Sequence, residues 1–306
     1  MRSIEVESLV KSYNGNRALN GISFSVNKGE IFGFLGPNGA GKTTTIKIIS
    51  TLLLPDDGKA RVCGHDVVDD SIEVRKEIGV LPERFGFYDD VSALSYLKFC
   101  GSFYFDSKKN VEERCIKLLK LVELEEFAGK KIKTFSHGMR QKLGLALSMI
   151  NDPELLILDE PLIGLDPKSK YEFKEMLKNL KKSGKTIFFS SHVLPEIQEV
   201  CDRVCILNRG HVVAIDSVEN LSQERIVLIR TLGVPDRLIH GIENTKGVNN
   251  VIRGDDSRSM EIGIEDYQTA GEINEFLVKN NVKVIEISRK EKKLEDVFIS
   301  LTGDKR

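Results

Sequence analysis

A glycine-rich segment followed by a lysine is the part of the sequence best suited to bind phosphate. It begins at Gly36 and reads Gly-x-x-x-x-Gly-Lys-Thr to Thr43. The apolar residues 30–36 predict a buried strand before it, and the apolar spacing after Lys42 predicts a helix. Glycines let backbone N–H groups approach phosphate oxygens, and the start of a helix adds partial positive charge. The segment therefore predicts a nucleotide site, without naming the reaction.

Each residue of this loop has an expected contact with the nucleotide. Lys42 is expected to reach the β- and γ-phosphates, and the Thr43 hydroxyl to ligate Mg²⁺. The alternative is a glycine-rich turn that binds no ligand, and the order strand, loop, helix argues against this alternative. The nucleotide-binding residues expected here are Gly36, Pro37, Asn38, Gly39, Ala40, Gly41, Lys42, Thr43 and Thr44.

Two adjacent carboxylates end a second apolar run. The segment PELLILDEP, residues 153–161, predicts a central strand that ends at Asp159 and Glu160. Ligands of open parallel sheets bind beside the carboxyl ends of the strands. We expect Asp159 to hold Mg²⁺ through water, and Glu160 to orient or deprotonate the water that attacks the γ-phosphate. Such a pair is often a solvated turn, but after a phosphate-binding loop it indicates nucleotide hydrolysis.

Length and composition restrict the class of protein that must position these residues. The 306 residues fit one large domain or a large and a small one. The 45 basic and 46 acidic residues nearly cancel, which argues against a surface made for polyanions. Five scattered cysteines indicate reduced thiols in a cytosolic setting. No stretch approaches the roughly 18 apolar residues of a membrane helix, and the N-terminus lacks an apolar signal region. If the protein works at a membrane, we therefore expect another chain to cross the bilayer.

The order of motifs along roughly the first 220 residues resembles the nucleotide-binding subunits of ABC transporters. The glycine-rich loop matches Walker A, and Leu158 to Glu160 match Walker B. Several ordered motifs are more specific than any one of them. The remaining matches are Tyr13 at the adenine-stacking position, Pro82-Glu83 at the Q-loop, Ser136 to Met139 at the signature, Leu165-Asp166 at the D-loop and His192 at the switch histidine.

The resemblance implies a role for each of these residues. Tyr13 would stack on adenine. His192 would hydrogen-bond the γ-phosphate and help to position the attacking water. Ser136 and Gly138 precede an apolar helical run, so they would stand at a helix N-terminus and bind the γ-phosphate held by a second copy. Asp166 would lie at the dimer interface; a simple turn there, and an ordinary strand-end tyrosine at Tyr13, remain the alternatives.

Three positions depart from the family pattern. His137 replaces the first glycine of the signature, and Met139 replaces its glutamine. Glu83 replaces the Q-loop glutamine and still offers an oxygen to Mg²⁺, although its charge is expected to alter metal dependence or rate. The changed signature and the changed Q-loop are both familiar in the branch of the family that resembles drug- and antibiotic-exporting ATPases. Because Glu160 and His192 are present, we expect an active site.

The resemblance also implies the domain organisation. The fold class is α/β: a P-loop NTPase core with an antiparallel β subdomain and an inserted helical subdomain at about residues 84–150, together forming an ABC-type ATP-binding domain over residues 1–221. In residues 222–306 the strand and helix patterns follow the order βαββαβ, which predicts a small ferredoxin-like domain closed by an amphipathic helix at 292–303. We expect this α+β accessory domain to support a dimer; regulator binding and simple packing are the alternatives.

The functional expectation is an ATP-binding and ATP-hydrolysing subunit of an exporter. ATP and Mg²⁺ are its cofactors, and its partners are a second copy, head-to-tail with ATP sandwiched between, and an integral membrane permease. This places it in the cytoplasm, peripheral on the inner face of the cell membrane. The aromatic residues Phe85, Phe87 and Tyr88 would line a groove for the permease, with core packing as the alternative.

Two other functions compete with this one. A soluble ABC-type ATPase could act on ribosomes or DNA, but the chain has one motif set, no visible coiled coil and no basic stripe, so we expect no nucleic-acid partner. A non-hydrolysing scaffold is disfavoured by the intact Glu160 and His192. The transported substrate does not follow from these motifs, because the membrane chain selects it.

Overall fold

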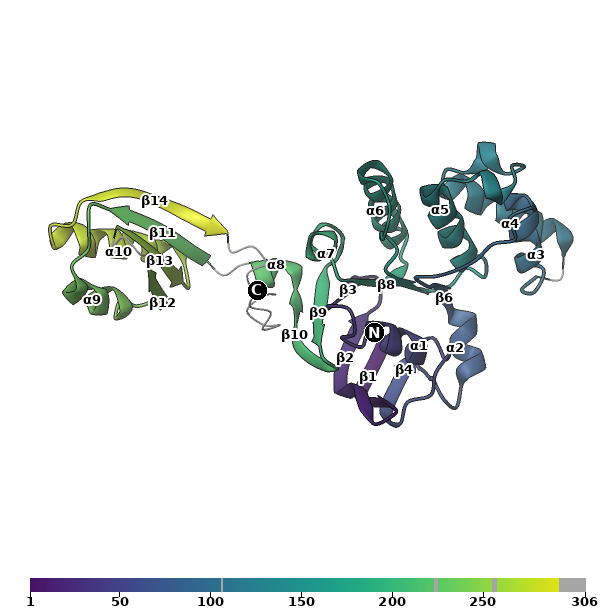
Figure 1. Ribbon diagram of the computed structural model, residues 1–306, viewed down its shortest axis with the longest axis horizontal. Coiled ribbons are helices and arrows are strands. Elements are labelled where there is room, and N and C mark those ends of the chain that lie inside the picture. Colours follow the sequence, from purple (N-terminus) through teal and green to yellow (C-terminus); the bar gives the residue numbers. More distant parts are fainter. Residues whose placement is uncertain (106, 223–224, 255–257, 292–306) are drawn as a thin grey trace. The chain divides into compact units, whose positions relative to one another are not determined.

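The computed structural model describes residues 1–105, 107–222, 225–254 and 258–291. It contains two compact units, of which the first runs from Met1 to Val218 and the second begins at Glu219 (Figure 1). The short helix α8, Val218–Ser222, lies at this junction. The closing helix expected at residues 292–303 lies outside the described residues.

The first unit is built on a six-stranded sheet that places the carboxyl ends of several strands side by side. The strand order is β10-β9-β3-β8-β7-β6, with β10 antiparallel to β9 and the other neighbours parallel. Every residue of β3, β7 and β8 is buried, which explains the apolar residues that make up most of each strand. The strands are β3 Ile31–Leu35, β6 Ile78–Leu81, β7 Leu155–Asp159, β8 Thr186–Ser191, β9 Arg203–Asn208 and β10 His211–Ser217.

Helices cover both faces of this sheet. Figure 1 shows α1 on one face and α6 and α7 on the other. Helix α1 follows the glycine-rich loop directly, so its N-terminus points into the region beyond β3. The helices are α1 Lys42–Ile49, α2 Ser71–Glu77, α6 Pro167–Lys182 and α7 Leu194–Val200.

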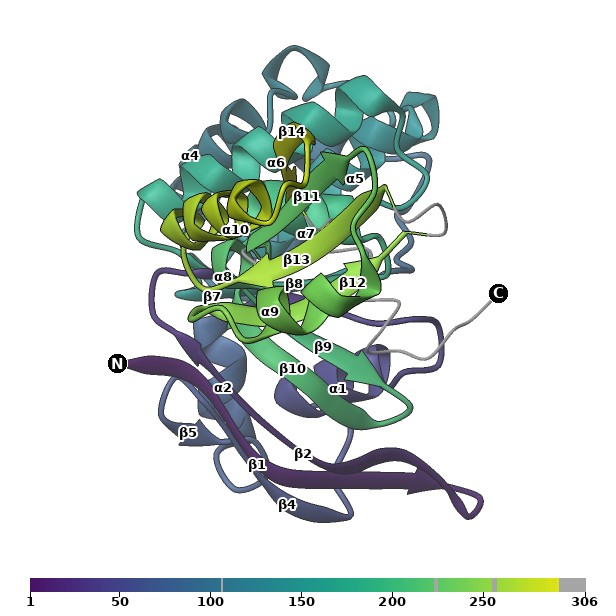
Figure 2. The same cartoon turned by 90° about the vertical axis from the view of Figure 1, so that its left-hand side faces the viewer.

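A second, antiparallel sheet packs on the same core. Its order is β2-β1-β4-β5, and Figure 2 shows β1, β2 and β4 as a separate layer. Phe24 of β2 joins the two sheets, because its ring stacks on Phe32 of β3 at a centroid distance of 5.9 Å and also contacts Phe188 of β8. The strands are β1 Arg2–Tyr13, β2 Asn16–Asn27, β4 Asp57–Val62 and β5 His65–Asp66.

The chain between β6 and β7 is helical. Ser92 caps the first of these helices, since its side chain accepts a hydrogen bond from the Ser95 N–H. Buried apolar residues such as Leu97, Leu118 and Leu143 hold the three helices together. The helices are α3 Ala93–Gly101, α4 Lys108–Leu121 and α5 His137–Ser148, with two 3-10 turns at Glu125–Phe127 and Ile132–Thr134. The antiparallel sheet and this inserted helical region confirm the expected fold class.

The second unit is an antiparallel sheet with helices against its core. The order β12-β13-β11-β14 is that of a split βαβ, ferredoxin-like fold, as the sequence pattern predicts. Side chains of α9 and α10, including Ile242 and Leu277, pack on inward residues of the strands such as Ile229 and Ile262. The elements are β11 Arg225–Thr231, a 3-10 turn Asp236–Leu238, α9 Ile239–Glu243, β12 Val248–Arg253, β13 Ser259–Ile264, α10 Tyr267–Lys279 and β14 Val284–Glu291.

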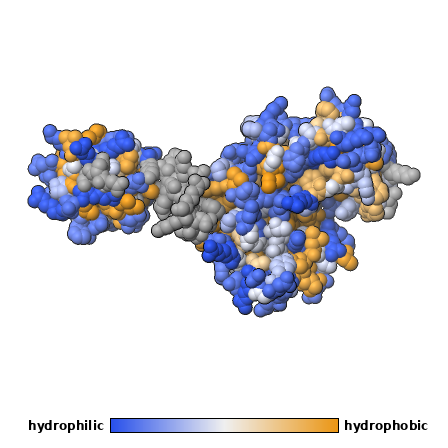
Figure 3. Space-filling model, viewed as in Figure 1, coloured by the Kyte–Doolittle hydropathy of each residue, from blue (hydrophilic) through white to orange (hydrophobic). Residues whose placement is uncertain are grey.

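Within the described residues, no helix is both long enough and apolar enough to cross a lipid bilayer. The molecular face in Figure 3 is mainly hydrophilic, with smaller hydrophobic patches.

Candidate functional site

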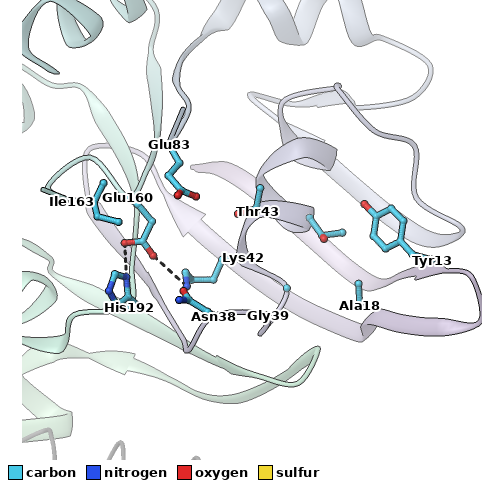
Figure 4. Close-up of a pocket in the computed structure, with 12 residues that line it drawn as sticks. Tyr13, Ala18, Asn38, Gly39, Lys42, Thr43, Glu83, Glu160, Ile163 and His192 are labelled. Carbon is cyan, nitrogen blue, oxygen red and sulfur yellow. Dashed lines mark hydrogen bonds and ion pairs between the residues drawn. The ribbon is translucent and has the colours of Figure 1, made fainter. Parts of the chain in front are cut away.

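A cleft of about 400 Å³ lies at the carboxyl ends of the central strands. Figure 4 shows its lining side chains, which come from the glycine-rich loop, the β1–β2 hairpin and the segments after β6, β7 and β8. The fold therefore brings together residues that are far apart in the sequence. The lining residues are Tyr13, Ala18, Asn38, Gly39, Gly41, Lys42, Thr43, Thr44, Glu83, Glu160, Ile163 and His192.

The loop between β3 and α1 needs its glycines for steric reasons. Gly41 has φ +110°, and a Cβ there would lie 2.7 Å from the Ala18 carbonyl oxygen. A Cβ at Gly36 would lie 2.4 Å from the Leu207 carbonyl oxygen. The loop is thus held tightly against the surrounding chain, and the Ala40 N–H closes a turn by donating to the Pro37 carbonyl at 3.1 Å.

Lys42 lies at the centre of the cleft with its ammonium among acceptors. Its Nζ donates to the Gly36 carbonyl at 2.7 Å and lies 3.2 Å from Glu160 Oε1. The Lys42 and Glu160 side chains are only 6% and 8% exposed. A buried charge costs several kcal/mol unless it is paired, so this pair compensates two charges that the fold has removed from water.

Glu160 also contacts the histidine expected to act with it. His192 Nδ1 lies 2.9 Å from Glu160 Oε2. A carboxylate only accepts hydrogen bonds, so Nδ1 carries the hydrogen and Nε2 is the remaining ring nitrogen. The backbone of Glu160 has φ +49°, which is unfavourable for a residue with a Cβ. The surrounding contacts therefore hold this carboxylate in a strained, defined position.

Ser190 is a site residue that sequence reasoning missed. Its hydroxyl donates to Asp159 Oδ1 at 2.7 Å and accepts from the Glu160 N–H at 2.9 Å. It reaches both because Asp159 and Ser190 are register partners on the parallel strands β7 and β8. The available signal was the serine pair that ends the apolar run before His192.

The environment of Asp159 favours a cation. Burial raises the pKa of the Asp159 carboxyl, and the negative charges of Glu160 and Glu83 raise it further, whereas hydrogen bonds from Ser190 and Thr43 oppose the shift. Like charges that gather in a buried site are stabilised by a bound divalent ion. The donor set of Thr43, Asp159 and Glu83 consists of oxygen atoms, which Mg²⁺ prefers, so these residues fit the expected metal.

Tyr13 and Ile163 lie elsewhere on the wall of the cleft. Tyr13 ends β1 with its side chain 44% exposed, at the side of the cleft farthest from His192 (Figure 4). Ala18 lies near it, and Ile163 lies near Glu160. The sequence analysis did not single out Ala18 or Ile163, because neither side chain carries a chemical signal of its own.

Seven predicted site residues do not line this cleft. Gly36, Pro37, Ala40 and Asp159 are close in the chain to residues that do, whereas Ser136, Gly138 and Asp166 belong to the starts of two helices. Ser136 caps α5 by accepting from the Met139 N–H at 3.2 Å, and Gly138 lies in the first turn of that helix. Asp166 caps α6 by accepting from the Lys168 and Ser169 N–H groups, and hydrogen bonds from Ser169 hold the pKa of its carboxyl below the usual range. Within one chain Ser136 and Asp166 are thus helix caps, and neither they nor Gly138 line the nucleotide cleft.

The three aromatic residues expected at a permease groove, Phe85, Phe87 and Tyr88, differ in how exposed they are. Phe87 contacts both Phe85 and Tyr96 edge to face, so Phe85 and Phe87 are half-buried in an aromatic cluster. Phe85 also fills the space beside Gly144 of α5. Tyr88, in contrast, is 68% exposed.

Known proteins resemble this chain in sequence and in structure. The ABC transporter family model matches residues 19–163. The linearmycin resistance ATP-binding protein LnrL of Bacillus subtilis (strain 168) is 32% identical over 98% of both chains. The daunorubicin/doxorubicin resistance ATP-binding protein DrrA of Streptomyces peucetius is 32% identical over 99% of this chain and 93% of its own.

One solved structure that resembles this chain contains bound nucleotide. The post-hydrolysis dimer of the ATP-binding cassette MJ0796, bound to ADP and Pi, matches with a TM-score of 0.64 and 26% identity over 70% of this chain and 98% of its own. The family model, the full-length relatives and the cleft geometry agree with one another. This chain belongs to the ATP-binding, ATP-hydrolysing subunits of ABC transporters.

Proposed function

We propose that this chain binds ATP with Mg²⁺ in the cleft, hydrolyses it in a head-to-tail dimer, and drives a separate permease that exports its substrate. The observation that carries this proposal is the series of contacts from the buried Lys42 through the buried Glu160 to His192 at the surface of the cleft. It joins a phosphate-binding cation to a carboxylate and then to a second proton-carrying group. Such an arrangement serves phosphoryl transfer to water.

Each residue of the cleft has a task in this reaction. Lys42 and the loop N–H groups would hold the phosphates, while Thr43, Asp159 and Glu83 would hold Mg²⁺, whose positive charge offsets the charge that develops on the phosphate oxygens. Glu160 accepts the proton of the attacking water through a carboxylate oxygen. The γ-phosphorus–oxygen bond to ADP breaks as the bond to water oxygen forms, which leaves inorganic phosphate.

His192 completes the positioning of the base. Its Nδ1–H donates to Glu160 Oε2, which fixes the orientation of the carboxylate. Nε2 is left to face the γ-phosphate, to which it donates a hydrogen bond when it also carries a hydrogen. Ser190 restrains the same site from behind, through Asp159 Oδ1 and the Glu160 N–H. Both contacts hold the base in place before the nucleotide arrives, which is how preorganisation lowers a barrier.

The head-to-tail dimer supplies the second half of each site. Ser136 and Gly138 lie at the N-terminus of α5 and do not line the cleft of their own chain. Helix N–H groups at such a position can receive an anion. A partner's γ-phosphate would occupy this position. Hydrolysis removes the group that both protomers hold, so the dimer can open and move a permease.

A mixing experiment tests this arrangement. The variants Lys42→Ala and Ser136→Ala are each expected to lose most ATP turnover. A heterodimer formed by mixing them contains one site with an intact Lys42 and an intact Ser136, so turnover is expected to reappear. Phosphate release measures it, with each variant alone as the control. A mixture no more active than its components would rule out the head-to-tail arrangement.

Export is proposed from the relatives. LnrL and DrrA are resistance proteins by name, and another relative, 36% identical over 69% of this chain, is the Nod factor export ATP-binding protein I of Ralstonia nicotianae. Full-length similarity to LnrL and DrrA also favours a membrane partner over an ATPase that acts alone. The chain would then be peripheral on the cytoplasmic face of the membrane.

A second cavity, of about 480 Å³, is the place where we expect the permease to contact this chain. It lies between the core strand β6 and the helices α3 and α5, and its edge carries Phe103, Tyr104 and Leu52, which are 73%, 55% and 69% exposed. Exposed aromatic residues around an apolar cavity are typical of contact surfaces. Phe103→Asp is expected to abolish co-purification with the permease while basal turnover persists, and Val278→Asp, at an exposed position of the second unit, is the control.

A further inference from the structure

His137 occupies the position at which the family signature has glycine, and its ring makes a contact that glycine could not make. It is the first residue of α5, and its Nε2 lies 3.1 Å from the Ile163 carbonyl oxygen. A carbonyl oxygen only accepts, so Nε2 carries the hydrogen and donates it. The signature turn is thereby bonded to a segment 26 residues further along the chain.

The segment that accepts this hydrogen bond begins at the catalytic carboxylate. The Ile163 N–H donates to the Glu160 carbonyl at 3.2 Å, so Ile163 belongs to the same turn as the base. The Ile163 side chain also lines the nucleotide cleft. A change in the cleft that moves this turn therefore acts directly on the acceptor of the His137 bond.

Close packing accompanies the hydrogen bond. Gly164 has φ +71°, and a Cβ there would lie 3.2 Å from His137 Nε2. A Cβ at Gly138 would lie 2.8 Å from Ser169 Oγ, whose hydroxyl donates to Asp166 at 2.6 Å. The first turn of α5 thus fits against the whole segment from Ile163 to Ser169, with room for no further side chain at two positions.

A largely buried lysine with two carboxylate partners fixes the same helix about one turn and a half further on. Lys142 of α5 donates to Glu172 of α6 and to Glu123, both at 2.9 Å, and its side chain is 11% exposed. These carboxylates raise the pKa of Lys142 against the opposing effect of burial. Since α5 is anchored to α6 at this point, displacement of its N-terminal turn depends on the contacts at His137 and Gly138.

We propose that His137 is a positioning residue that couples the two composite sites of the dimer. Through Ile163 it ties the Ser136–Gly138 turn, which faces the partner's nucleotide, to the turn that carries Glu160 in its own cleft. The occupancy of one cleft then alters the placement of the signature turn in the other. This inference rests on the head-to-tail dimer proposed above and concerns the regulation of that same site.

Two substitutions separate the hydrogen bond from the presence of a side chain. His137→Ala removes the donor, and His137→Gln retains an amide N–H that can reach the same carbonyl. We expect His137→Ala to lower kcat about threefold to tenfold, the range for one lost hydrogen bond. Its Hill coefficient for ATP is expected to fall from above 1 to about 1, with KM little changed. His137→Gln is expected to restore most of kcat and of the Hill coefficient. His240→Gln, at an exposed imidazole of the second unit, is the control and is expected to change neither kcat nor the Hill coefficient.

Hydrogen exchange tests the hydrogen bond between His137 and the Ile163 carbonyl independently of turnover. The backbone amides of residues 161–166 are expected to exchange faster in His137→Ala than in the wild type, and at wild-type rates in His137→Gln. Wild-type cooperativity in His137→Ala, equal losses in both variants, or a wild type without cooperativity would each overturn the coupling role. The mixing of Lys42→Ala with Ser136→Ala tests the dimer itself, so a failure there is distinguishable from a failure here.

Discussion

The two units of this chain treat buried charge in opposite ways. In the first, Lys42, Asp159 and Glu160 are each at most 7% exposed; Lys42 and Glu160 line the nucleotide cleft, and Asp159 directly precedes Glu160. In the described part of the second, the buried polar side chains are the hydroxyls of Thr231 and Thr269. Burying a charge lowers stability unless partners compensate it, as Lys42 and Glu160 compensate each other at the cleft.

Sheet type explains why the charges gather in one unit. The parallel strands β3, β7 and β8 all end at the same edge of their sheet, so the loop after β3, Asp159 with Glu160, and His192 meet there. In the antiparallel sheet of the second unit, neighbouring strands end at opposite edges. Chemistry therefore concentrates in the first unit, and the second has its own apolar core.

The largest effect on turnover is expected from Glu160→Gln. The amide has the same shape but cannot accept a proton, so kcat is expected to fall about 10²- to 10⁴-fold while ATP binding and ATP-dependent dimerisation persist. Phosphate release and light scattering measure the two properties. Turnover equal to that of the wild type would remove Glu160 from the role of base.

Lys42→Ala is expected to act on affinity. It removes the ammonium that holds phosphate and leaves the buried Glu160 carboxylate without its cationic partner. Charged hydrogen bonds contribute about 1.5–3 kcal/mol each, so the Kd for ATP is expected to rise at least about tenfold. Titration calorimetry measures the Kd, with the exposed Lys109→Ala as the control. Unchanged affinity would contradict the assignment of this loop.

Ser190→Ala is expected to have an intermediate effect. Losing the hydroxyl leaves Asp159 Oδ1 and the Glu160 N–H without this shared partner, and kcat is expected to fall about tenfold. The neighbouring Ser191→Ala is a matched control, because that hydroxyl donates to Glu196, which does not line the cleft. Equal loss of kcat in both variants would mean that Ser190 matters for folding alone.

Ile262→Ala is expected to have the smallest effect on turnover and a large effect on the second unit. It leaves a cavity in a fully buried position, which costs about 2–5 kcal/mol of unfolding free energy for that unit. Hydrogen exchange of β13 and α10 measures this loss, and kcat is expected to stay unchanged. A matching fall in kcat would show that the nucleotide site depends on the second unit.

Much of this structure was predictable because its signals are local. The glycine-rich loop lies between an apolar run and a helical repeat, and the order βαββαβ is readable in residues 225–291, so both units had recognisable patterns. The same reasoning placed Lys42, Glu160 and His192 in one site. It missed Ser190, Ala18 and Ile163, because a serine, an alanine and an isoleucine indicate nothing until a neighbouring strand or turn brings them to the cleft.

The sequence by itself determined which chemical groups are available: a lysine on a phosphate-binding loop, two carboxylates after an apolar strand and a histidine after another. Only the tertiary structure decided their partners. The parallel register sets Asp159 beside Ser190, and the packing of α5 on the segment after β7 places the His137 ring on the Ile163 carbonyl. The reason is physical, since a hydrogen bond requires two atoms within about 3 Å, and distance between remote segments is set by packing and not by spacing along the chain.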